Sequence, residues 1–161
     1  MKSLFKKNLP FLVAPILLLS FTSMPAKINL SGEWKLNEGK SEFGEFGSRF
    51  ASKSIKIEQK DDAITISKTG ANDNVSTETL TYDGKESETT VFGTAKKKST
   101  AKWAEDGQSL IIVYNIAMER NGQTMEFKGT ETWSLKDGAL SLQTVSSSPR
   151  GEMTTKAIYD K

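Results

Sequence analysis

The sequence predicts an all-β protein, built as a single antiparallel up-and-down barrel of about eight to ten strands. Runs rich in Thr, Ile, Val and aromatic residues alternate apolar and polar side chains with period two, as half-buried strands do. Turn-forming pairs such as Asp83-Gly84, Asn121-Gly122 and Asp137-Gly138 separate these runs and supply the positive φ angles of tight hairpins. No long stretch has helical periodicity. Because a meander protects its edges best by closing, a barrel is expected, with a two-sheet sandwich as the alternative.

The expected strands follow one another with short connections, and a loop or short helical turn lies near residues 40–50. The strands lie near Leu30–Leu36, Lys53–Gln59, Ala63–Thr69, Ser76–Tyr82, Glu86–Phe92, Lys97–Ala104, Ser109–Arg120, Thr124–Leu135, Ala139–Ser146 and Met153–Asp160.

The first 26 residues are typical of a secretory signal peptide. Three lysines precede an apolar run, Leu9–Phe21, and small residues lead to an expected cleavage after Ala26. A retained membrane anchor is the alternative, but Pro10 and Pro15 interrupt a run shorter than the roughly 20 residues that a span requires. We therefore expect one domain, residues 27–161, that is exported to a periplasmic or extracellular compartment, with no integral membrane anchor.

Composition excludes several classes of function. The chain has no Cys and no His, which removes disulfides, thiol and imidazole catalysis and the usual zinc sites. Its formal charge of +2 comes from the signal segment, because 22 basic residues less three lysines leave 19 against 20 acidic ones. Nucleic acid is therefore not an expected partner. No calcium-loop spacing or convergent carboxylate pair is evident, so we expect no metal, no cofactor and no enzymatic activity, with a hydrolase as a remote alternative.

Aromatic residues provide the main candidate for a binding site. A small barrel either fills its interior or encloses one ligand, and a pocket for an apolar ligand needs aromatic walls with a few polar groups. Core packing is the competing interpretation for each of them. The expected ligand-binding residues are Tyr82, Trp103, Tyr114, Phe127, Glu131 and Trp133.

Glu131 has an unexpected position for a carboxylate. Alternation places it on the same face as Phe127 and Trp133, where an unpaired carboxylate would suffer a large desolvation penalty. We interpret it as a polar anchor for the ligand. Alternatively, it lies near the barrel mouth, is solvated, or pairs with a lysine.

The segment between the first two strands is a candidate lid. Phe43, Phe46 and Phe50 recur at spacings of three and four, so a helical turn would place them on one face, with Gly44 and Gly47 as hinges. A structural plug at one end of the barrel is the alternative.

The run Lys96-Lys97-Lys98, together with Lys102, is the most basic part of the mature chain. Alternation places Lys96, Lys98 and Lys102 opposite Trp103. Lysines of this kind commonly protect an exposed strand edge, with an anionic surface as the less favoured interpretation.

Gly32-Glu33-Trp34 at the start of the first strand resembles the opening of the lipocalin and wider calycin barrels. The resemblance implies that Gly32 and Trp34 close one end of the barrel, with Lys156 or Arg150 as the basic residue above the indole. Several segments are also similar to small exported bacterial proteins described only as lipocalin-like, a group without an established activity. These segments are Leu30–Asn37, Lys40–Gly44, Ser99–Trp103, Thr132–Leu135 and Ala157–Lys161.

These patterns together favour an exported monomeric barrel that binds a small, largely apolar molecule without covalent chemistry. The alternative function is that of a solid-core barrel acting through its surface, as an envelope interaction or inhibitory module. A continuous interior cavity would favour the first and a filled interior the second.

Overall fold

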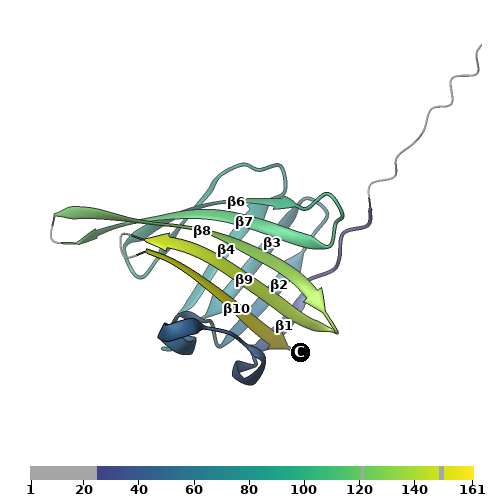
Figure 1. The fold of residues 1–161 in the computed structure, drawn as a ribbon. Coiled ribbons are helices and arrows are strands. Elements are labelled where there is room, and N and C mark those ends of the chain that lie inside the picture. Colours follow the sequence, from purple (N-terminus) through teal and green to yellow (C-terminus); the bar gives the residue numbers. More distant parts are fainter. Residues whose placement is uncertain (1–24, 121, 149–150) are drawn as a thin grey trace, which may run out of the picture.

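A computed structural model describes residues 25–120, 122–148 and 151–161, which form a nearly closed barrel of antiparallel strands (Figure 1). The ten strands in this part of the chain lie in the sheet order β4-β3-β2-β1-β10-β9-β8-β7-β6-β5. The predicted all-β class and antiparallel barrel are confirmed. The strands are β1 (Gly32–Leu36), β2 (Ser54–Gln59), β3 (Ala63–Thr69), β4 (Val75–Thr81), β5 (Ser87–Val91), β6 (Ala95–Trp103), β7 (Ser109–Arg120), β8 (Gln123–Lys136), β9 (Ala139–Ser148) and β10 (Gly151–Asp160).

The β8–β9 connection shows how the turn residues set the register. Asp137 and Gly138 both have positive φ, 52° and 80°, and Lys136 pairs directly with Ala139. Two consecutive positive φ angles give a two-residue turn whose twist matches that of the strands it joins. The register that follows directs Glu131, Trp133 and the other odd residues of β8 into the barrel.

One half of the barrel is a closed apolar core. It lies toward the β2–β3, β6–β7 and β8–β9 turns, where the N-terminal segment also pairs, Ile28 N–H donating to the Gly107 carbonyl at 3.0 Å. We call it the closed half. Its inward side chains are shielded from solvent almost completely. They include Leu30, Trp34, Ile64, Leu80, Ala101, Leu110, Ile112, Trp133 and Leu140.

Trp34 fastens the N-terminal segment to the closed half. Its indole Nε1 donates to the Leu30 carbonyl at 3.0 Å, and the ring is 1% exposed. The Lys161 ammonium lies 5.1 Å from the ring centroid, so a basic residue does cover the indole. That residue is Lys161 rather than Lys156, because the pairing of β1 with the end of β10 brings the C-terminal residue to Trp34. Arg150 lies outside the described residues.

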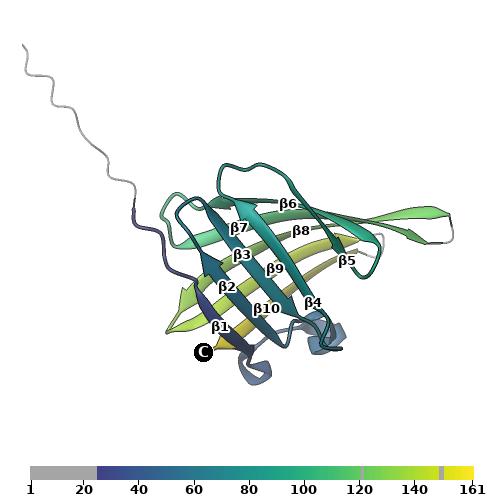
Figure 2. The same ribbon diagram turned by 180° about the vertical axis from the view of Figure 1, so that it is seen from behind.

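The other half is open. The β7–β8 hairpin extends well beyond the rest of the barrel, on the left in Figure 1 and on the right in Figure 2. Inward side chains there are only partly buried. They include Tyr114, Ile116, Met118, Met125, Phe127, Thr144 and Ser146. We call this part of the barrel, nearest the β3–β4 and β9–β10 turns, the open half.

The seam between β4 and β5 is closed by side chains. These strands are the two edges of the sheet, and in the described residues no backbone ladder joins them. Instead Lys97 of β6 reaches Glu78 of β4, with Nζ 2.7 Å from Oε1, and the Ser99 hydroxyl donates to the other carboxylate oxygen at 3.2 Å. The barrel therefore depends on interior polar contacts for its closure.

The predicted signal segment is outside the described residues except for Pro25 and Ala26. Within the part of the chain that the structure describes, no helix combines the length and apolar character needed to cross a membrane.

Replacing Trp34 by Phe should destabilise the protein by about 1–3 kcal/mol, because the aromatic packing persists while the buried Leu30 carbonyl loses its donor. Lys161→Met removes only the cation above the ring and should cost less, about 0.5–1 kcal/mol. Urea unfolding of the two variants measures both losses. Equal losses would contradict the assignment of the larger contribution to the indole hydrogen bond rather than to the Lys161 contact.

Candidate functional site

Glu131 lies on β8 and points into the barrel as predicted, where it pairs with a lysine. Lys68 Nζ from β3 is 2.8 Å and 3.0 Å from its two oxygens, and the Trp133 indole donates to Oε2 at 3.0 Å. Its side chain is 9% exposed and that of Lys68 is 19% exposed. The carboxylate is thus satisfied by an ion pair that crosses the barrel interior, which was one of the alternatives left open by the sequence.

A second ion pair lies beside the first. Lys97 and Glu78 are both nearly inaccessible, and Lys97 Nζ also lies 5.2 Å from the centroid of the Tyr114 ring. Lys68 Nζ lies 5.0 Å from the Trp133 ring in the same way. We call Lys68, Glu78, Lys97 and Glu131 the charged floor, because they separate the apolar closed half from the open half.

Three of these four residues were missed by sequence reasoning, although alternation carried a signal for each. Lys68 shares a face with Ile64 and Ile66, Glu78 shares one with Leu80, and Lys97 shares one with Ala101. The lysine run hid Lys97, since its neighbours Lys96 and Lys98 are exposed as expected. The predicted role as protection of a strand edge is wrong, because β6 is paired with β5 on one side and with β7 on the other.

The surroundings of Lys68 and Glu131 favour the charged form of both groups. Burial alone raises the pKa of Glu131, but the Lys68 and Lys97 ammonium groups outweigh it and hold the pKa below its ordinary value. Burial alone lowers the pKa of Lys68, but the Glu131 and Glu78 carboxylates leave it above its ordinary value. Both of these charges are therefore stabilised by opposite charges on more than one strand.

Tyr114 and Phe127 belong to the wall of the open half, next to the floor. Tyr114 lies against Gly129 on the neighbouring strand, where a Cβ atom would overlap the tyrosine ring. Burial, with a smaller effect of the Glu131 carboxylate, raises the pKa of Tyr114 to about 12, so the phenol stays protonated. Phe127 follows on the same face of β8, opposite Ile116.

Tyr82 and Trp103 lie at the other end of the barrel. Their rings pack with centroids 5.6 Å apart, and the Lys27 ammonium lies 4.7 Å from the Tyr82 ring. The Tyr82 hydroxyl donates to the Ala63 carbonyl at 3.1 Å, and burial raises its pKa to about 12. The structure thus brings Tyr114, Phe127, Glu131 and Trp133 together and leaves the Tyr82–Trp103 pair apart, in the closed half.

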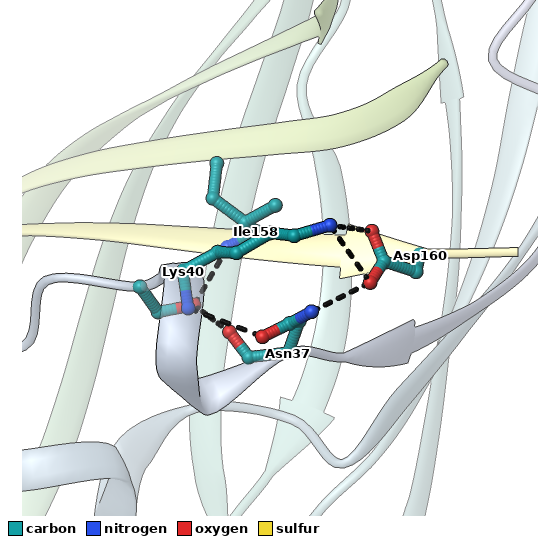
Figure 3. A network of polar contacts seen from close by, with 5 residues as sticks. Asn37, Lys40, Ile158 and Asp160 are labelled. Carbon is teal, nitrogen blue, oxygen red and sulfur yellow. Dashed lines mark hydrogen bonds and ion pairs between the residues drawn. The ribbon is translucent and has the colours of Figure 1, made fainter. Parts of the chain in front are cut away.

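The segment between β1 and β2 contains two short 3-10 helices, η1 (Glu38–Lys40) and η2 (Gly44–Phe50), at the lower ends of the strands in Figures 1 and 2. Figure 3 shows how η1 is attached to β10. Asp160 accepts from Asn37 Nδ2 at 2.6 Å and pairs with Lys40 at 3.1 Å. Ile158 N–H donates to the Ser41 hydroxyl at 2.9 Å, so the base of the segment is fixed to the last strand.

The predicted lid phenylalanines do not form one continuous apolar face. Phe43 packs against the core, whereas Phe50 is 69% exposed. The reason is a break at Gly47, whose φ of 58° and ψ of −159° are non-helical, so helical spacing does not extend through η2. The side chain of Phe46 lies outside the described part of the molecule. The apolar contact between this segment and the barrel runs through Phe43, in addition to the polar contacts with β10.

Two hollows lie on the outer surface of the barrel, over β6–β9. One, of about 420 Å³, runs between outward side chains that include Lys98, Val113, Asn115 and Thr130. The other, of about 460 Å³, is lined by Ile111, Trp103 and neighbouring residues. Val113, which lines both, is 50% exposed.

Among the residues that the structure describes, no group of three or more acidic, His or Cys side chains is placed to hold a metal ion.

Comparison with known structures identifies solved proteins with the same barrel fold. The zebrafish ileal bile acid-binding protein complexed with cholic acid matches with a TM-score of 0.58 and 19% identity, over 81% of this chain and 97% of that one. The REP1-NXSQ fatty acid transporter matches with a TM-score of 0.57 and 16% identity, over 82% of this chain and 95% of that one. Family models and curated proteins give no match to the sequence. At these identities the likeness establishes the barrel.

Removing one member of the Lys68–Glu131 pair should be far more harmful than removing both. Glu131→Ala leaves the Lys68 ammonium without its carboxylate and should cost about 3–5 kcal/mol in unfolding free energy. The double variant Lys68→Met, Glu131→Leu replaces the pair by apolar groups and should recover most of that loss. Denaturant unfolding measures both. A double variant as unstable as Glu131→Ala would show that the pair is a net source of stability.

The Lys68–Glu131 pair should make the unfolding free energy depend on pH in both the acidic and the alkaline range. Because the pKa of Glu131 is lowered in the folded protein, its stabilising contribution is present above the ordinary value of 4.5 and is lost as the pH falls through the folded value. The pKa of Lys68 is raised, so its contribution is present below 10.5 and is lost as the pH rises through the folded value.

We expect the contribution of the pair to unfolding free energy to stay constant from about pH 5 to 10 and to decline outside that window. The double variant should have a shallower slope below pH 4.5, measured by urea unfolding at each pH. Equal acid slopes for the two proteins would contradict the assignment.

Proposed function

We propose that the open half of the barrel binds one small, largely apolar molecule non-covalently. The apolar body lies along the wall formed by Tyr114, Phe127 and Ile116, and its polar end rests on the charged floor. Glu131 acts with Lys68 and Lys97 as the polar anchor. Trp133 supports the anchor from below through its hydrogen bond to Glu131. The segment with η1 and η2 acts as the lid, hinged at the fixed contact between Ser41 and β10.

The charged floor is the observation that carries this proposal. Two ion pairs in the interior of a small barrel require the desolvation of four charges, and apolar side chains of similar volume are often as stable or more stable. The Glu78–Lys97 pair closes the seam, but stability alone does not account for the Lys68–Glu131 pair beside it. A ligand site does, because the floor lies where the fully buried interior meets side chains that solvent still reaches.

The structural neighbours support the same class of ligand. One is complexed with cholic acid and the other is a fatty acid transporter by name. Both ligands are small amphipathic molecules, and the open half offers this chain apolar and polar surfaces side by side.

Binding rather than catalysis is the role we assign to the floor. In the described residues, both interior carboxylates are engaged by ammonium groups at 2.7–3.0 Å. A general acid or base would need a carboxyl group with a pKa near the working pH, whereas the pKa of Glu131 is driven in the opposite direction.

The surface-acting module is the second candidate, and the outer hollows favour it. They lie over β6–β9 beside the exposed Val113, while the closed half behind them is a filled apolar core. A protein that acts through this face would lose its partner on Val113→Lys and keep it when the open half is altered.

Export and a monomeric state complete the proposal. The signal-like segment supports removal of residues 1–26 on secretion, which the intact mass of protein purified from its native source would test. The same measurement under native conditions gives the number of protomers. A retained segment or a stable dimer would contradict these two parts of the proposal.

Native mass spectrometry of the purified protein, followed by titration with medium-chain and sterol-like amphipaths, tests the binding proposal. We expect one ligand per chain. Phe127→Ala should weaken binding about tenfold or more, because a buried phenyl contact contributes roughly 1.5–3 kcal/mol. Val113→Ala on the outer face is the matched control and should leave binding unchanged. Absence of any bound amphipath, or equal losses in the two variants, would refute an interior site.

A further inference from the structure

We propose that the charged floor selects ligands whose polar end is uncharged, such as an alcohol, over ligands that end in a carboxylate. This inference rests on the proposed interior site and adds the chemical class of the headgroup. A barrel that binds an acid would instead have more positive than negative groups in its interior.

The floor has no net charge. Among inward strand positions whose side chains the structure describes, the charged residues are Lys68, Glu78, Lys97 and Glu131. Other polar groups on the inner face near them, such as Ser99 and Thr144, are neutral. Two ammonium and two carboxylate groups cancel, and each lysine is already paired with a glutamate.

A carboxylate ligand would bring a third negative charge into this setting. It would compete with Glu131 for Lys68 or with Glu78 for Lys97, and one of the three carboxylates would be left buried without a full partner. An uncompensated buried charge is among the most costly arrangements in a protein interior. Protonation of Glu131 would not remove the extra negative charge at neutral pH, because the Lys68 and Lys97 ammonium groups hold its pKa below the ordinary value.

A hydroxyl group meets the same floor without this penalty. In the described contacts Lys97 Nζ donates to Glu78, and Glu131 accepts from Lys68 and from the Trp133 indole. An ammonium has three donor hydrogens and a carboxylate has about four acceptor sites, so each group has capacity for one more bond. A hydroxyl can accept from a lysine and donate to a glutamate at the same time, and it leaves both ion pairs intact.

A matched pair of ten-carbon probes tests the inference on the wild-type protein. We expect 1-decanol to bind at least about tenfold more tightly than decanoate at pH 7.5, since one unpaired charge near the floor costs more than 1.4 kcal/mol. Calorimetric titration gives both affinities.

Glu131→Gln should abolish or reverse the preference, because it gives the floor a net charge of +1. Decanoate should then bind about tenfold or more tightly than it does to the wild type, while decanol changes less than about threefold. Glu126→Gln makes the same charge change on the same strand at an exposed position paired with Lys128, and should alter neither affinity.

The outcomes separate the inference from the proposed function. If wild type binds neither probe, nor any amphipath of the wider panel, the interior site itself is refuted. If it binds decanoate as tightly as decanol, or if a folded Glu131→Gln variant leaves the decanoate affinity unchanged, the site stands and headgroup selection by the floor is overturned.

Discussion

The pairing of charges across the barrel interior is the constraint on which the rest of this structure depends. Lys68 on β3 and Glu131 on β8 join strands on opposite sides of the barrel, and Glu78 on the edge strand β4 meets Lys97 on β6 across the interval where the backbone ladder is interrupted. If the charges were unpaired, their desolvation would oppose folding. Once paired, they hold the seam closed, orient Trp133 and divide the interior into an apolar half and an open half.

This division explains why the aromatic residues have two different roles. In the closed half, Trp34 is fixed by a hydrogen bond to Leu30 and covered by Lys161, and Tyr82 packs on Trp103 beneath Lys27. These rings have their polar atoms or faces engaged with the protein itself. Near the floor, Tyr114 keeps a partly exposed surface on the inner wall. A ligand bound as proposed would therefore find its aromatic contacts on one side of the floor only.

The sequence predicted the strands well because their signal is local. Alternation and the positive-φ turns act over a few residues, and they also showed that Glu131 must face inward. The partners of Glu131 depend on contacts between distant strands, 63 residues apart for Lys68, and alternation within one strand cannot supply them. Lys97 was hidden for a related reason. Because the neighbours of Lys97 are exposed, the lysine run resembled one that protects the edge of a sheet. Its partner Glu78 lies on the other side of the seam.

The predicted lid segment illustrates the opposite case, in which the spacing of residues along the chain predicted a more regular helix than the structure contains. The spacing of Phe43, Phe46 and Phe50 fits a helix, yet the glycine between the last two breaks it, and Phe50 turns to solvent. What holds the segment in place is polar: Asn37, Lys40 and Ser41 bond to the end of β10 (Figure 3). The base of the η1–η2 segment and the cover of Trp34 thus both depend on two consecutive residues, Asp160 and Lys161. A change at this end of β10 would therefore affect the attachment of the segment and the packing of Trp34 together.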